Sequence, residues 1–124
     1  MIRTAFLFLG LLLLPLSAHA ENDALTSFTD APGLYLMQGL TESADESMLF
    51  DKPEGRIVSA IAYGPVTRPD VLAFYQSLLP QLGWAKNRFG QYRRDGEALS
   101  LTVTNAENHL TRLEITIEPV QQTP

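Results

Sequence analysis

The chain has 124 residues, no cysteine and a formal net charge of −5 at neutral pH. The lack of cysteine excludes disulfides, thiolate catalysis and a lipid-modified N-terminal cysteine. The acidic balance argues against nucleic acid or anionic lipid as the main partner, because both favour basic surfaces.

Residues 1–20 have the parts of a cleavable signal peptide. Arg3 is the only early charge, an unbroken apolar stretch runs from Ala5 to Leu16, and the small residues Ala18 and Ala20 precede the expected cleavage point. The apolar stretch is short for a helix that must cross about 30 Å of hydrocarbon. We therefore expect cleavage after Ala20, export to the periplasm or beyond the cell, and no stable membrane span afterwards.

The expected mature chain divides into an arm, a domain and a tail. Residues 21–46 mix polar residues with a short apolar patch at 34–37, which follows a turn sequence at 30–33. We expect a loosely ordered arm over 21–46, whose apolar patch could tuck against the core. An α+β domain is expected over 47–119, and a frayed tail over 120–124.

A hairpin and a helix are predicted for the first half of the domain. The β-prone runs 48–50 and 56–64 flank a Pro/Gly turn, which is typical of a hairpin. A helix is predicted from Thr67, which can cap its N-terminus, to Leu82, with a left-handed cap at the following glycine. Its expected apolar stripe consists of Val71, Phe74, Tyr75, Leu78 and Leu82.

Pro80 lies inside the predicted helix. Proline has no N–H to donate and crowds the preceding turn, so we expect the regular helix to stop near Leu79. Residues 80–82 would then form an irregular last turn.

Three β-prone runs follow the helix: 84–94, interrupted at Gly90; 98–104; and 110–118. The second and third alternate apolar with polar residues, and Asp95-Gly96 is a strong hairpin signal. We therefore predict an α+β fold with an antiparallel sheet of about five strands. The order along the chain is β-β-α-β-β-β, with one helix packed on one face of the sheet.

No catalytic, cofactor-binding or metal-binding constellation stands out. His109 is the only histidine of residues 21–124 and is expected to be a solvated turn residue. The segment 42–54 is rich in acids, but their spacing matches no EF-hand loop, so a solvated acidic loop is favoured over a weak calcium site. No phosphate-cradling glycine loop or nucleophile elbow is present. We therefore expect a protein that is not an enzyme and holds no cofactor.

A basic cluster stands out against the acidic background. It could contact a partner or an anion, while cross-strand salt bridges to Glu97 and Glu114 are the favoured structural explanation. The cluster comprises Lys86, Arg88, Arg93 and Arg94.

Three aromatic residues near one end of the helix could line a ligand cleft: Tyr75, Trp84 and Tyr92. The alternative explanation is core packing, with Trp84 closing the end of the core and Tyr75 in the buried stripe of the helix.

Several phrases of the sequence resemble a family of small exported bacterial proteins of unknown function. They are the segments 71–75 (with its Phe-Tyr pair), 79–84 (which ends in Gly-Trp), 92–97 and 51–56. The resemblance covers roughly residues 49–118. It implies a compact, periplasmic α+β domain, with a helix that leads into a β-meander, and it carries no activity.

Three functions are compatible with these observations. The first is a non-enzymatic periplasmic domain that binds an envelope protein or assists an assembly, through an exposed sheet edge or the basic cluster. The second is a small-ligand or lipid carrier with an aromatic cleft. The third is a hydrolase of unknown substrate that uses acids of residues 42–54.

Overall fold

The computed structural model describes residues 25–120. The expected signal peptide (1–20) and residues 121–124 of the expected tail lie outside the described residues. Val120 donates its N–H to the Gly96 carbonyl oxygen at 2.8 Å, so this residue still belongs to the folded part. Within residues 25–120, no helix combines the length and the apolar character needed to cross a membrane.

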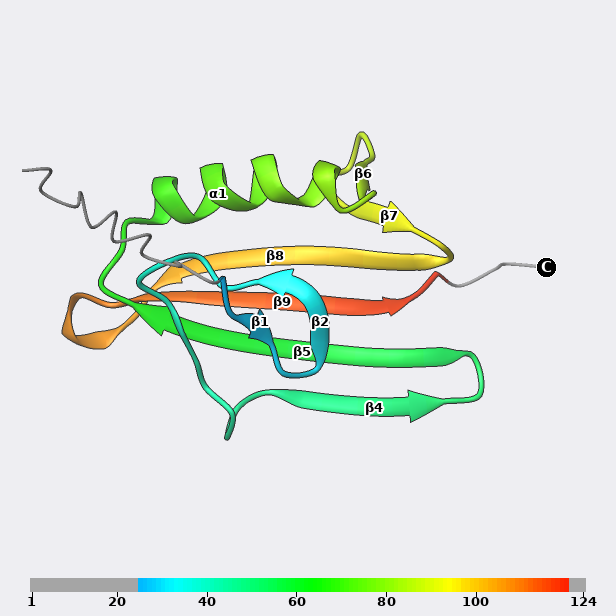
Figure 1. Ribbon diagram of the computed structural model, residues 1–124, viewed down its shortest axis with the longest axis horizontal. Helices are drawn as coiled ribbons and strands as arrows, with labels where there is room; N and C mark the ends of the chain where they lie inside the picture. Colours follow the sequence, from blue (N-terminus) through cyan, green and yellow to red (C-terminus); the bar gives the residue numbers. More distant parts are fainter. Residues whose placement is uncertain (1–24, 121–124) are drawn as a thin grey trace, which may run out of the picture.

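One helix and a long antiparallel sheet form most of the fold (Figure 1). In chain order the elements are β1 (Ser27–Phe28), β2 (Ala31–Tyr35), β3 (Thr41–Glu42), β4 (Met48–Lys52), β5 (Gly55–Gly64), α1 (Arg68–Gln81), β6 (Ala85–Lys86), β7 (Tyr92–Arg94), β8 (Glu97–Asn105), the 3₁₀ turn η1 (Glu107–His109) and β9 (Thr111–Pro119).

The main sheet has the order β3-β5-β9-β8-β7-β6, and β4 pairs with β5 beside β3. The α+β class and the antiparallel pairing are confirmed. The sheet has seven strands rather than about five, for two reasons. The run 84–94 folds back on itself as β6 and β7, because Asn87 accepts hydrogen bonds from the N–H groups of Phe89 and Gln91 and closes the turn. The short β3 adds the other strand.

The core lies between the sheet and α1. Leu99 and Val103 of β8 are buried, so the apolar side of this strand faces the core as its alternation predicts. The inward side chains of β5 and β9 complete this side of the core: Val58, Ala60, Ala62, Leu113, Ile115 and Ile117. The opposite face of the sheet, termed the open face below, carries mostly polar side chains at its centre.

Helix α1 begins as predicted. The Thr67 hydroxyl accepts the Asp70 N–H at 3.3 Å, and Arg68 is the first helical residue. The helix continues through Pro80 to Gln81 instead of stopping near Leu79, because Pro80 lies in the last turn and costs only one backbone hydrogen bond there. Gly83 closes the helix with a φ of +88°. The Arg68 Nε also donates to the Val103 carbonyl oxygen at 3.0 Å, which ties the start of α1 to β8.

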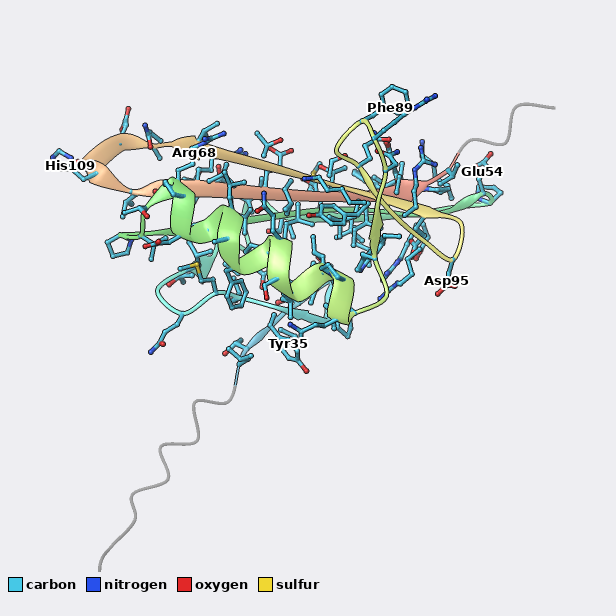
Figure 2. The ribbon with its side chains drawn as sticks, turned by 90° about the horizontal axis from the view of Figure 1, so that it is seen from above. Tyr35, Glu54, Arg68, Phe89, Asp95 and His109 are labelled. Carbon is cyan, nitrogen blue, oxygen red and sulfur yellow. The ribbon has the colours of Figure 1, made fainter. Side chains whose placement is uncertain are left out.

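The N-terminal segment differs from the loosely ordered arm that we expected. It forms β1, β2 and β3, and it buries five side chains in the core: Phe28, Ala31, Leu34, Leu36 and Leu40. Figure 2 shows Tyr35 of β2 on the same side of the sheet as α1. The hairpin β1-β2 therefore covers the part of the inner face that one 14-residue helix leaves free.

Gly64, at the end of β5, allows this segment to cross the sheet. A Cβ atom at Gly64 would lie 2.0 Å from the Gly39 carbonyl oxygen and 2.8 Å from its carbon. Only glycine permits that approach of two backbones. The loop that leads from β2 into β3 is thus fixed against the sheet by the absence of a side chain.

Candidate functional site

The most distinctive surface of the described chain is the outer edge of β4. This strand pairs with β5 on one side, and no other strand among residues 25–120 pairs with its outer side. All five residues of β4 are exposed. Met48, Leu49 and Phe50 have exposed fractions of 50%, 44% and 51%. An unpaired edge with three large apolar side chains is a template for an added strand.

The register with β5 assigns these side chains to the two faces. Phe50 lies opposite Ile57 and Met48 opposite Ser59, so both belong to the open face. Leu49 lies opposite the buried Val58 and belongs to the face that carries α1. An added strand would therefore meet apolar contacts on both faces.

A loop at residues 43–47 separates β4 from β3. The Ser43 N–H donates to the Ile61 carbonyl oxygen at 2.7 Å, and the Ile61 N–H donates to the Ser47 hydroxyl oxygen at 3.0 Å. The Ser47 hydroxyl in turn donates to the Ser43 carbonyl oxygen at 2.8 Å. The loop thus bonds the N–H and the carbonyl of Ile61 in place of a neighbouring strand. The free edge of β4 is therefore limited to five residues, about 17 Å.

Acidic residues lie at both ends of this edge. Residues 41–54 contain five carboxylates and a single cation, Lys52. The carboxylates are Glu42, Asp45 and Glu46 before β4, Asp51 within it, and Glu54 in the turn after it.

Two of these carboxylates have partners in the fold. Glu42 accepts from the Thr29 N–H at 3.1 Å and from its hydroxyl at 2.8 Å. Glu46 accepts from the Tyr63 hydroxyl at 2.9 Å, and hydrogen bonds from Ser43 and then Tyr63 lower the pKa of Glu46. Hydrogen bonds to the charged form keep this carboxyl ionised at neutral pH.

The described residues contain no group of three or more His, Asp or Glu side chains arranged to hold a metal ion. The acids of residues 42–54 are spread along the two flanks of β4, and Glu42 and Glu46 are occupied by hydrogen bonds.

The predicted basic cluster is divided between different surfaces. Arg93 is opposite Ala98 and lies on the open face, whereas Lys86 is opposite the buried Tyr92 and lies on the face that carries α1. Arg88 stacks on Phe89 in the loop between β6 and β7, with 4.9 Å from guanidinium to ring. This loop extends to the side of the sheet away from Tyr35 (Figure 2).

Arg94 has a structural role. Its guanidinium lies 4.4 Å from the centre of the Trp84 ring, and its Nη1 donates to the Leu82 carbonyl oxygen at 2.9 Å. Its Nε is buried with no hydrogen-bond partner among the described residues. A cation at the C-terminal end of α1 satisfies a carbonyl that the helix leaves unpaired.

Glu97 and Glu114 form salt bridges, but their partners are not the residues of the basic cluster that we expected. Arg56 on β5 pairs with Glu97 at 3.2 Å, and Arg112 on β9 pairs with Glu114 at 2.8 Å.

The aromatic residues of the predicted ligand cleft are all in the core. Tyr75, Trp84 and Tyr92 are buried, and none of them lines either of two hollows of the described surface, one on the open face and one beside β1 and β3. Their positions agree with the alternative explanation, core packing. The small-ligand and hydrolase functions stay predictions.

The larger hollow, about 1020 Å³, lies on the open face where the β4-β5 and β7-β8 turns meet the end of β9. Figure 2 places Glu54 and Asp95, which belong to those two turns, at the same end of the sheet. The hollow is open and its lining is mixed in charge; it includes Lys52, Glu54, Ile57, Arg93 and Glu118. It continues the surface that begins at β4.

One sequence signal for the β4 edge was present in Met48-Leu49-Phe50. Because side chains alternate along a strand, three consecutive large apolar residues cannot all face one core. Comparison of the chain with protein-family models, with curated proteins and with solved structures found no match.

Proposed function

We propose that this protein is a non-enzymatic, exported binding module that holds a protein partner by adding an extended segment of that partner to β4. The observation that carries the proposal is the unpaired outer side of β4 with its three half-exposed apolar side chains. An added strand would satisfy the outward backbone groups of β4 and cover Met48 and Phe50 on one face and Leu49 on the other. Export is part of the proposal, and the signal-peptide pattern of residues 1–20 supports it.

The architecture supports such a role. The side of the sheet that α1 and the hairpin β1-β2 cover is the packed core, so strand addition at β4 needs no rearrangement of it. Monomeric proteins commonly protect a sheet edge with short strands, charges or proline. Here the first three residues of β4 are large and apolar, and the charged residues Asp51 and Lys52 stand only at its end.

Site-specific photo-crosslinking in intact cells tests the proposal. A benzophenone-bearing amino acid replaces Met48, Leu49 or Phe50, one at a time, and the matched control carries it at Phe89, which is 76% exposed on a different loop. Strand addition predicts adducts from the three β4 positions that move by one residue each along a single partner segment. The control position should give none of these adducts.

Two results would overturn the proposal. One is a set of adducts that is the same for Phe50 and Phe89. The other is adducts from β4 that scatter over a partner's surface or do not form at all, while circular dichroism shows that each variant is folded.

A further inference from the structure

We infer that the segment captured by β4 is apolar at its centre and basic at both ends, and that the acidic flanks of β4 keep a second copy of this chain from pairing there. This inference rests on the proposed function, and it concerns the chemistry of the partner.

The argument starts from the distribution of charge around the edge. The apolar part of β4 is Met48 to Phe50, and carboxylates stand on both sides of it, at Asp45 and Glu46 and at Asp51 and Glu54. Of the four, Glu46 alone has a described hydrogen bond from a strand of the sheet. An approaching strand therefore meets negative charge at each end, whichever direction it runs.

Neighbouring cations offset these flanks only in part. Arg56 lies opposite Asp51 but is paired with Glu97. Arg112 is paired with Glu114, and its charge also favours the ionised form of Glu46. Lys52 remains as the single cation of residues 41–54. Complementary charge across an edge raises the association rate and selects partners.

A second copy of the chain is the obvious competitor, because strand edges often pair with themselves. Antiparallel self-pairing centred on Leu49 would match Met48 of one copy with Phe50 of the other. It would also bring residues 44–47 of one copy beside residues 51–54 of the other, so that both ends of the junction carry carboxylates. Lys52 would then face Glu46, which Tyr63 already holds.

The shifted registers of self-pairing are worse. If Phe50 of one copy lies opposite Phe50 of the other, Leu49 lies opposite Asp51, and Glu46 lies opposite Glu54. Like charges directly opposite each other destabilise a sheet. Each copy brings four carboxylates and one lysine to the junction. A basic-ended segment avoids this repulsion and gains attraction at both ends.

Synthetic peptides test the inference with the protein produced from the full-length chain. The probe is fluorescein-labelled Lys-Lys-Val-Thr-Val-Thr-Val-Lys-Lys, and the comparison peptides carry Glu in place of every Lys, or Pro in place of the central Val. Fluorescence anisotropy at low ionic strength measures binding. The basic peptide should bind about ten-fold more tightly than the acidic one, since several exposed ion pairs contribute roughly 0.2–1 kcal/mol each.

Salt and substitutions identify the source of the difference. Added salt should shrink the preference, because the charges are exposed. The double variant Asp51→Asn with Glu54→Gln should reduce it, because two of the four flanking carboxylates are removed. The matched control Glu107→Gln, in the η1 turn beyond β8, should keep it.

The possible outcomes separate this inference from the proposed function. Equal binding of basic and acidic peptides, both above the proline peptide, would overturn the charge selection and leave strand addition standing. Binding of no peptide above the proline control would overturn the inference, and the crosslinking pattern then decides the proposed function alone. A dimer in sedimentation analysis that Phe50→Lys dissociates would overturn the exclusion of a second copy.

Discussion

The hydroxyl of Tyr75 joins helix α1 to strand β2 by two hydrogen bonds. It donates to the Tyr35 carbonyl oxygen at 2.9 Å and accepts the Met37 N–H at 3.1 Å. Tyr75 is fully buried. One phenol thus satisfies two backbone groups of the N-terminal segment from inside the core.

The substitution Tyr75→Phe should therefore lower the free energy of unfolding by about 1–3 kcal/mol, because a half-buried carbonyl and a half-buried N–H lose their partner. Urea denaturation measures the loss. Hydrogen exchange should locate the weakening at residues 35–37. Tyr35→Phe is the control, since it keeps the backbone carbonyl that Tyr75 binds; an equal loss in both variants would contradict this role of the hydroxyl.

Alkaline pH should destabilise the protein through the same residue. Burial raises the pKa of Tyr75 to about 12, and the Met37 N–H acts weakly in the opposite direction. The unfolded chain ionises near the ordinary value of about 10. Below that pH the stabilisation is fully present, and it is lost as the pH rises through the interval, at about 1.4 kcal/mol per pH unit.

The measurement compares urea unfolding of the parent protein and Tyr75→Phe at pH values from about 9 to 11. Burial also raises the pKa of Tyr92, so the parent curve contains two contributions of the same sign. The difference between the two proteins isolates Tyr75. Parallel curves would show that its ionisation is not linked to folding.

Gly64→Ala should destabilise the fold by about 1–3 kcal/mol or more, because the new methyl group would overlap the Gly39 carbonyl. The matched control is Gly90→Ala, where a Cβ atom meets nothing within 4 Å and the cost comes from the φ of +82° alone. Denaturant midpoints should fall more for Gly64→Ala, with increased hydrogen exchange in residues 37–42. A smaller effect than that of Gly90→Ala would mean that the loop at Gly39 moves away from β5 without a cost in stability.

Arg94 and Arg93 should behave differently although they are adjacent. Arg94→Gln should cost about 1–3 kcal/mol and change the emission of Trp84, because the stacking and the bond to Leu82 are lost. The Arg93 side chain is exposed, so Arg93→Gln should change the unfolding free energy by less than about 0.5 kcal/mol. Thermal and urea unfolding of both variants decide the point, and equal losses would contradict it.

Export makes a simple chemical prediction. The protein recovered from the cell envelope should begin at Glu21, as read by mass spectrometry of the intact chain. Ala20→Arg should block processing, since the peptidase requires a small residue at that position. A parent protein that retains residues 1–20 would contradict the interpretation of this segment.

The sequence predicted those parts of the fold whose signals are local. Thr67 and Gly83 mark the ends of α1 by their own cap chemistry, and the alternation at 99–103 and 113–117 shows which side of β8 and β9 is buried. Each of these signals acts within a few residues. It is therefore independent of the rest of the chain.

The N-terminal hairpin was not predicted, because its order comes from contacts distant in sequence. Leu34 and Leu36 are buried in a core built from distant elements, and Tyr75, about 40 residues away, binds the backbone beside them. The spacing of apolar residues at 25–40 matches neither a clean helix nor a clean strand. Such segments are ordered by tertiary packing, which a local pattern does not contain.

The candidate site was predicted only as an unspecified sheet edge. Three of the four named contact residues lie against aromatic rings, and the three cleft aromatics fill the core. A sequence shows where charged and aromatic residues stand along the chain, but not which of them pack against each other. What distinguishes β4 is the pairing that it lacks, and this depends on the order of strands in the sheet.

The two borders of the sheet are unequal, and this limits how large an assembly can become. On the border away from β4, β6 has two residues, and farther along β8 the Val103 carbonyl is already occupied by Arg68. A fibre grows only if each unit has a receptive strand on both borders. Under the proposed strand addition, one receptive border takes a single added strand, so one partner segment per chain is expected.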